Sequence, residues 1–366
     1  MKSPGLQSDS VPTPGQTRGP WGLALGLVLL LLVGAGLSMT VGTRADVGLA
    51  AAFRSLMAQF GWADPLPAAD AWIVGLRWDR TVLTALVGAA LALSGGLLQG
   101  VFRNDLAAPS ILGTTAGASL GASVAILAVG GYGLASLAGL GPAPVLIELG
   151  AFAGAAIVTL TVAWLGRVDG RVSVPTLLLV GIAMNAVLGG ILAAIQSFAL
   201  ADFEVAKALF AWGFGSLDDK GSAEIAMVAV ALFVALLAIP AVARELDLLE
   251  SGEEDARSIG VHTGRVQAIA LLAATLCAAA SVAAVGQIAF VGLVVPHILR
   301  WASGRSYRRL LPLCLLGGAA FLLVVDASQR HLLGSLRLRP GVTMSLVGGP
   351  FFLLLLMADR RRLRAW

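Results

Sequence analysis

Long apolar stretches, separated by short polar segments, run through most of the chain. A helix needs about 20 apolar residues to cross a hydrocarbon core of roughly 30 Å. Nine stretches are clear candidate spans: Trp21–Met39, Thr81–Val101, Ile111–Val129, Val145–Leu165, Val174–Leu200, Ile225–Ala243, Val266–Val285, Leu310–Val325 and Val342–Ala358. A tenth, Ile288–Leu299, is interrupted by Pro296 and His297 and is predicted as a short or broken span. The pattern predicts an all-α polytopic membrane protein with about ten transmembrane helices.

The composition excludes a water-soluble globule. Of 366 residues, 58% are hydrophobic and only 13% are charged, which is about half the charged share of a soluble domain. Residues 1–20 are rich in Ser, Pro, Gly and Gln and are predicted to be a disordered cytoplasmic tail. Residues 21–366 are predicted to form a single transmembrane domain that contains a polar loop at 246–264.

The basic residues lie between apolar blocks, which gives no indication of a nucleic-acid groove. With ten spans both chain ends lie on one side of the membrane. More Lys and Arg residues fall on that side than on the other when both ends are placed inside. The positive-inside rule therefore favours a multi-pass protein whose termini are both cytoplasmic.

Neutral groups, not ionised ones, occupy the middle of the predicted spans. Examples are Gln99, Asn185 and Gln196, whereas Asp326 and Arg330 lie at the end of the ninth span and are spaced to pair with each other. An ion-coupled secondary transporter, which is one alternative, would need a titratable group near the midplane. Energy for any transport is therefore expected to enter from outside the bilayer.

Small residues recur at four-residue spacing at Gly113, Gly117 and Gly121, which favours close helix packing. The same stretch contains a G-x-S-x-G match around Ser119, and an intramembrane serine protease is the alternative interpretation. Such a protease needs a histidine facing the serine, but His297 and His331 both lie away from span centres. No metalloprotease motif or ATP-binding loop occurs in the chain, so no enzyme activity and no metal site are predicted.

The loop at 246–264 predicts a short helix that begins at an acidic cluster. Glu253 and Glu254 would lie in its first turn, where the helix dipole favours negative charge. Glu253 and Arg257 are spaced for an ion pair, and Gly260 can supply a left-handed cap at the helix end. A solvated loop helix is the simpler interpretation, and a helix that docks into a cytoplasmic partner is the sharper one.

Several motifs, in order, resemble the permeases that import iron–siderophores, haem and cobalamin in binding-protein-dependent ABC transporters. Residues 88–113 read GAALALSGGLLQGVFRNDLAAPSILG, and residues 286–300 read GQIAFVGLVVPHILR. The loop at 252–261, DASQR at 326–330 and PGVTMSLVGGPFF at 340–352 complete the series. One departure is Asn104-Asp105, where Asn-Pro is usual. The matching motif residues are Gln99, Asn104, Pro109, Gly113, Pro296 and His297.

The resemblance implies a permease that pairs with a second copy of itself, with two cytoplasmic ATPase subunits and with a periplasmic substrate-binding protein. ATP would be bound by the ATPase, so the chain itself needs no cofactor. The expected cargo is a ferric chelate, meaning a siderophore or haem, with cobalamin as the alternative, and the expected location is a bacterial inner membrane.

The resemblance also assigns roles to particular residues. Outer arginines would dock the binding protein, namely Arg77, Arg80 and Arg330. The ATPase coupling segment would contain Gly252, Glu253, Glu254, Ala256, Arg257 and Gly260. The fifth and tenth spans would line the pathway or face the second copy, through Asn185, Gln196, Pro340, Gly349 and Pro350.

Overall fold

A computed structural model describes residues 20–42, 47–130, 143–168, 171–334 and 338–363 of the chain. Most of these residues are helical, apart from a two-residue antiparallel pair of strands, β1 (Arg167–Val168) and β2 (Arg171–Val172). The helices are α1 (Pro20–Thr40), α2 (Leu49–Gln59), α3 (Ala68–Phe102), η1 (Pro109–Leu112), α4 (Thr114–Val129), α5 (Ala143–Leu165), α6 (Val174–Ala199), α7 (Phe203–Gly213), α8 (Ser222–Leu249), α9 (Glu253–Ser258), α10 (Thr263–Val285), α11 (Val291–Ser303), α12 (Tyr307–Leu333) and α13 (Pro340–Leu363).

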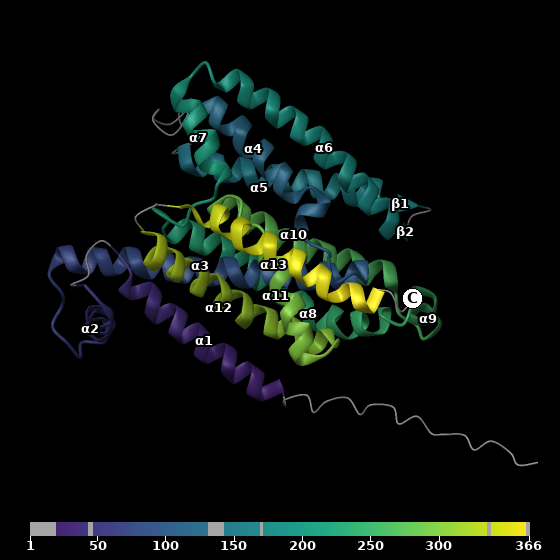
Figure 1. Ribbon diagram of the computed structural model, residues 1–366, viewed down its shortest axis with the longest axis horizontal. Coiled ribbons are helices and arrows are strands. Elements are labelled where there is room, and N and C mark those ends of the chain that lie inside the picture. Colours follow the sequence, from purple (N-terminus) through teal and green to yellow (C-terminus); the bar gives the residue numbers. More distant parts are fainter. Residues whose placement is uncertain (1–19, 43–46, 131–142, 169–170, 335–337, 364–366) are drawn as a thin grey trace, which may run out of the picture.

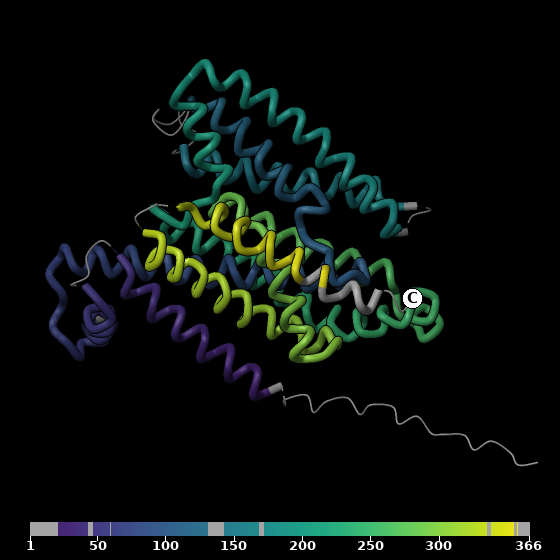
Figure 2. Tube along the Cα trace, viewed as in Figure 1, coloured from purple at the N-terminus to yellow at the C-terminus, as the bar shows by residue number. Residues whose placement is uncertain are grey.

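The long helices lie side by side in two groups (Figure 1). One group has α3 at its centre, in contact with α8, α10, α11 and α12, and α1 packs against α12. The other group contains α4, α5 and α6, and α10 joins the two by contacting both α4 and α5. The tube in Figure 2 shows that α2 and α9 lie at opposite ends of the molecule, and these ends are called the α2 end and the α9 end.

All ten predicted spans coincide with helices, and seven of these helices are long and apolar enough to cross a membrane. The chain is therefore a helical, multi-pass membrane protein. The predicted third span is shorter than expected because Gly113 adopts a left-handed conformation between η1 and α4. The predicted short span is a continuous 13-residue helix, α11, and Pro296 lies inside it without breaking it. The predicted tail at 1–20 falls almost wholly outside the described residues.

Close helix packing depends on glycine at the crossing points. A Cβ atom on Gly95 of α3 would overlap the carbonyl oxygen of Gly292 in α11, and one on Gly121 of α4 would overlap that of Gly150 in α5. The small-residue spacing at Gly117 and Gly121 therefore serves helix packing, as predicted. Two helices, α2 and α7, were not expected, because each is only 11 residues long.

Candidate functional site

The short helix α9 forms a tight unit with the start of α10. Gly252 precedes it with a φ of 131°, and Arg257 pairs with Glu253 at 2.5 Å, as their spacing predicted. The Arg257 Nε also donates to the Thr263 hydroxyl at 3.0 Å, and Ala256 is fully buried. These contacts fix the position of α9 relative to α10.

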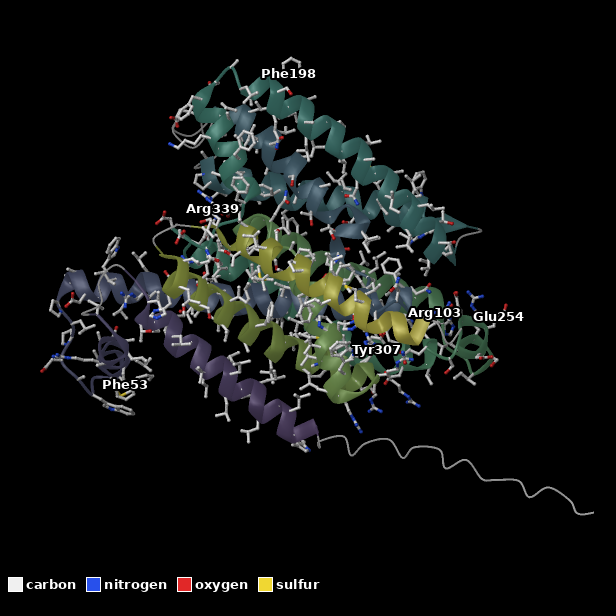
Figure 3. All side chains as sticks on the ribbon, viewed as in Figure 1. Phe53, Arg103, Phe198, Glu254, Tyr307 and Arg339 are labelled. Carbon is white, nitrogen blue, oxygen red and sulfur yellow. The ribbon has the colours of Figure 1, made fainter. Side chains whose placement is uncertain are left out.

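The outward side of α9 is open. Glu254 and Asp255 are exposed there, and Ile259 is 64% exposed although it is a large apolar residue. Gly260 follows with a φ of 90°, which confirms its predicted left-handed conformation. A shallow pocket of about 530 Å³ lies beside it, lined by Arg257 and residues 260–265. Figure 3 shows Glu254 at the tip of this end of the molecule, where a partner can reach it.

A buried arginine lies behind α9 and joins four elements. Arg300 of α11 donates to Gln99 Oε1 of α3 at 3.1 Å and to the Tyr307 hydroxyl of α12 at 3.1 Å. Its guanidinium group also lies 3.5 Å from Glu250, three residues before α9, and 3.4 Å from Asp105. The family-motif glutamine therefore acts as a partner of Arg300, and the departure at Asp105 adds a second carboxylate to it.

The other motif residues near this end shape the backbone. Asn104 accepts a hydrogen bond from the Leu106 N–H at 2.9 Å just after α3 ends, and Pro109 begins η1. A Cβ atom on Gly113 would lie 2.9 Å from Val158, so only glycine fits this left-handed position. His297 is buried next to Pro296 in α11 and packs edge-on against the Trp301 ring. The surroundings of these residues therefore indicate a structural role, in shaping the backbone or in packing against neighbouring side chains.

At the α2 end, Arg77 is turned into the protein. It is buried, and its guanidinium group donates to the backbone carbonyls of Met39, at 2.8 Å, and of Val47. These carbonyls belong to the end of α1 and to the segment before α2. Arg77 therefore joins α3 to the connection between α1 and α2.

Arg80 and Arg330 share one fully buried carboxylate. Asp326 of α12 accepts from Arg80 at 2.7 Å and pairs with Arg330 at 3.0 Å, which confirms the predicted pairing of Asp326 with Arg330. Arg80 also pairs with Asp218, and Arg330 donates to the Ser38 hydroxyl of α1 at 2.9 Å. All three arginines assigned to docking thus have partners within the chain, and their docking role stays a prediction.

Helix α6 is the most exposed of the candidate spans. Only 11% of its most apolar window is buried, compared with 83% for α3. Asn185 donates to the Ser110 carbonyl of η1 at 3.0 Å, and Gln196 is half-buried nearer the other end of α6. Gly189 and Gly190 lie between them, and a Cβ atom on either would meet no other described part of the chain within 4 Å beyond the adjacent turns of α6.

Helix α13 also has an open side. Pro340 begins it and is buried, and the neighbouring Gly341 N–H donates to the Phe214 carbonyl at 3.2 Å. Gly349 lies against the Phe290 ring, whereas Pro350 is exposed one residue further along. The structure therefore leaves both helices that were assigned to the pathway partly uncovered.

The described residues offer no constellation for covalent chemistry. Ser119 donates to the Thr115 carbonyl at 2.9 Å and accepts from the Gln287 side-chain amide at 2.6 Å, so an amide and not an imidazole faces it. No group of three His, Cys, Asp or Glu side chains that could hold a metal ion occurs among the described residues. Ser119 therefore belongs to a polar contact between α4 and the segment before α11.

The residues that sequence analysis missed are mostly the partners of buried arginines. Arg300 lay at the end of a quoted motif but was given no role, Asp105 was noted only as a departure from the family motif, and Glu250 was not singled out. Asp247 was also missed; it bonds the Ser306 hydroxyl at 2.9 Å and the Tyr307 N–H, and so caps α12. An isolated arginine at the end of an otherwise apolar motif was the available signal.

The fold and these sites define a class: a helical, multi-pass membrane protein with a short exposed helix, α9, at one end and no catalytic centre among its described residues. The chain belongs to the FecCD transport family, whose model matches residues 28–358. The family consists of the membrane permease subunits of ABC transporters. These permease subunits are not themselves enzymes.

Individual relatives cover nearly the whole chain. The cobalamin import system permease protein BtuC of Halobacterium salinarum is 36% identical, over 91% of this chain and 88% of its own length. The hemin transport system permease protein HmuU of Yersinia pestis is 33% identical, over 93% of this chain and 97% of its own. A solved structure of a metal-chelate type ABC transporter in an inward-facing conformation is 25% identical, with a TM-score of 0.75 over 93% of this chain and 99% of that one.

Proposed function

We propose that this chain is the transmembrane subunit of an ATP-driven importer that moves a ferric chelate, a siderophore or haem, from the periplasm to the cytoplasm. The observation that carries the proposal is the family match over residues 28–358, joined to an exposed helix, α9, at one end of the bundle. In this proposal ten helices cross a bacterial inner membrane, the α9 end is cytoplasmic, and so are both termini.

The charged groups inside the bundle support an external energy source. The buried carboxylates of the described residues are Glu148 and Asp326, and each pairs with a cation: Glu148 with Lys220 at 2.7 Å, and Asp326 with two arginines. A carboxylate held by a permanent partner is poorly suited to load and release a coupling ion. ATP bound by a partner subunit is the proposed source, so the chain itself needs no cofactor.

The coupling segment is proposed to be the ATPase contact. Glu254 on α9 and Ile259 directly after it are both exposed, so this end offers a partner an acidic group and an apolar group, which suits a cleft with a hydrophobic floor and a basic rim. Behind α9, Arg300 links Glu250 to α3, α11 and α12. A movement imposed on α9 would therefore reach the core of the bundle through Arg300.

A second copy of the chain is proposed to cover α6. Its exposed residues include several small ones at three- and four-residue spacing, which in membranes favours close contact between helices. These residues are Ala186, Gly189, Gly190, Ala193, Ala194 and Ser197. The pathway would then lie between the two copies, with Asn185 and Gln196 supplying neutral polar groups to it.

A leucine at Gly190 tests this assignment. Because a Cβ there would meet no described residue within 4 Å beyond the adjacent turns of α6, Gly190→Leu should leave the single subunit folded but disturb the contact between two copies. Gly26→Leu in α1 is the matched control, since that position is equally open but lies on a different helix. We expect a lower share of dimer for Gly190→Leu by mass photometry; equal dimer shares in both variants would contradict the role of α6.

Uptake by the purified transporter tests the proposed cargo. The chain, its ATPase and its binding protein would be reconstituted in proteoliposomes and supplied with labelled haem, ferric siderophore or cobalamin. We expect ATP-dependent uptake of a ferric chelate. Cobalamin is the second candidate because a cobalamin permease shares 36% identity with this chain, and uptake of cobalamin alone would favour it. Uptake driven by a proton or sodium gradient without ATP would contradict the proposal.

A further inference from the structure

Helix α2 carries an apolar stripe that the described part of the chain leaves partly exposed. Leu49, Phe53, Leu56 and Phe60 are 52%, 63%, 38% and 63% exposed. Their spacing of four, three and four residues places them on one face of the helix and its last turn. An 11-residue helix with an open aromatic and aliphatic face has no packing reason of its own to persist in water.

The direction of α2 differs from that of the spans. Figure 1 shows α2 almost end-on beside the end of α1, whereas α1, α3 and α12 run across the view. A transmembrane bundle aligns its long helices with the membrane normal, so α2 lies close to the plane of the membrane surface.

The depth of α2 follows from its contact with α1. The Leu49 side chain lies 3.7 Å from the position that a Cβ on Gly36 would occupy, in the last part of α1. The 21 residues of α1 rise about 32 Å, which is the thickness of the hydrocarbon core. The beginning of α2 is therefore level with the boundary between the acyl chains and the headgroups.

The surroundings of the stripe are those of a membrane boundary. The neighbouring helix α1 also exposes apolar side chains, namely Leu29, Val33 and Leu37. Trp62 and Trp72 are 74% and 68% exposed nearby, and the Trp62 ring lies 5.5 Å from that of Phe60. Tryptophan collects at membrane interfaces because its ring is apolar and its N–H is polar.

We propose that α2 is an in-plane membrane anchor whose apolar stripe is inserted among the phospholipids of the leaflet at the α2 end. The polar side of the helix fits this position, because Arg54 lies beside the exposed Asp64, with its Nε donating to the Asp64 carbonyl at 3.2 Å. Phospholipid is favoured over a second copy because Figure 1 places α1 and α2 on the opposite side of the molecule from α6. The anchor would hold the segment between α1 and α3, and with it the Arg77 contact, at a fixed height.

Spin labels on single cysteines test the insertion. Cys277 and Cys314 are fully buried, so an added exposed cysteine can be labelled selectively. The variants Phe53→Cys and Leu56→Cys probe the stripe, and Asp64→Cys, at a side chain that is 95% exposed, is the aqueous control. Leu29→Cys in α1 is the lipid reference. Each full chain would be assembled with its ATPase in nanodiscs of phosphatidylethanolamine and phosphatidylglycerol, and its relaxation by oxygen and by a water-soluble nickel chelate would be measured.

We expect the stripe labels to resemble Leu29→Cys, with oxygen relaxing them several-fold more than nickel, and Asp64→Cys to show the reverse. Equal nickel relaxation of Phe53→Cys and Asp64→Cys would overturn the proposal, because the stripe would then face water. Strong immobilisation of the Phe53→Cys label only when the binding protein is added would assign the stripe to that protein instead. Dipolar coupling between Phe53→Cys labels on two chains would assign it to the second copy.

Discussion

The two ends of the bundle bury arginines in different ways. At the α2 end, Arg80 and Arg330 both depend on Asp326, whose side chain has no exposed surface. At the α9 end, the single Arg300 is shared among Gln99, Tyr307 and two carboxylates, Asp105 and Glu250, whose side chains are 37% and 30% exposed.

The difference concerns what remains when one partner is lost. Removal of Asp326 would take away the one buried carboxylate that both arginines share. Arg80 would keep only the exposed Asp218, and Arg330 would keep only neutral partners such as the Ser38 hydroxyl. Loss of Glu250 or Asp105 would leave Arg300 with other partners, and loss of Arg300 would leave carboxylates that water already reaches. We therefore expect the pairing at the α2 end to stay fixed, whereas the α9 end can change its pairing at a lower cost, as its proposed coupling role requires.

Asp326→Asn should have the largest effect of the changes considered. It keeps the shape of the side chain but removes the charge that holds Arg80 and Arg330, and breaking a buried pair in this way costs about 3–5 kcal/mol. We expect a strongly lowered Tm and little monodisperse protein, as measured by size-exclusion fluorescence in detergent. Asp218→Asn is the control, because its side chain is 67% exposed and a surface pair contributes only about 0–1 kcal/mol. Similar Tm values for both variants would remove the distinction between the ends.

Arg300→Met should affect coupling more than folding. The methionine keeps the apolar stem, and the two half-exposed carboxylates can hydrate, so we expect a loss of about 1–3 kcal/mol. ATP hydrolysis by the assembled transporter should continue while uptake per ATP falls several-fold, because Glu250 is no longer joined to the core. Arg300→Lys tests geometry, since lysine keeps the charge but lacks the planar fork that reaches several partners at once. Wild-type transport in both variants would exclude Arg300 from coupling.

The sequence alone predicted the helices of the fold far better than it predicted these networks of arginines and carboxylates. Apolar runs such as Val266–Val285 coincide with a helix because, in a membrane, the chain must satisfy its backbone within each segment. The local pair Glu253–Arg257 was also predictable from helical spacing. The pairing of Arg80 with Asp326, 246 residues away, was not, because it depends on α3 and α12 lying side by side. A resemblance assigned Arg80 to an outside partner, and only the packing shows that it has an inside one.

Gly260→Pro should weaken the ATPase contact without unfolding the bundle. Gly260 has a φ of 90°, whereas proline requires about −65°, so the end of α9 must rearrange. We expect partial loss of the ATPase in pull-down at unchanged Tm of the isolated subunit, since Gly260 is exposed. Gly61→Pro is the matched control, because Gly61 is also exposed and has a φ of 72° but lies at the α2 end. Equal retention of the ATPase by the wild type and Gly260→Pro would contradict the assignment of the coupling segment.

The smallest expected effect concerns the pH dependence at the α9 end. Burial raises the pKa of Glu250, and the neighbouring Arg300 opposes that rise only in part. An unfolded glutamate titrates near pH ~4.3, so the folded state holds this proton at a higher pH than the unfolded state. The cost of ionising the Glu250 carboxyl in the folded protein is therefore absent below the pKa of the unfolded state. The free energy of unfolding falls as the pH rises through the pKa of the folded state. Relative to Glu250→Gln, the wild type should lose about one degree of Tm or less between pH 4 and 7, because the group is half-exposed. Glu254→Gln, on the open side of α9, is the control. If the Tm of the wild type instead rises relative to that of Glu250→Gln as the pH increases, pairing with Arg300 outweighs burial. The α9 end would then be held as firmly as the α2 end.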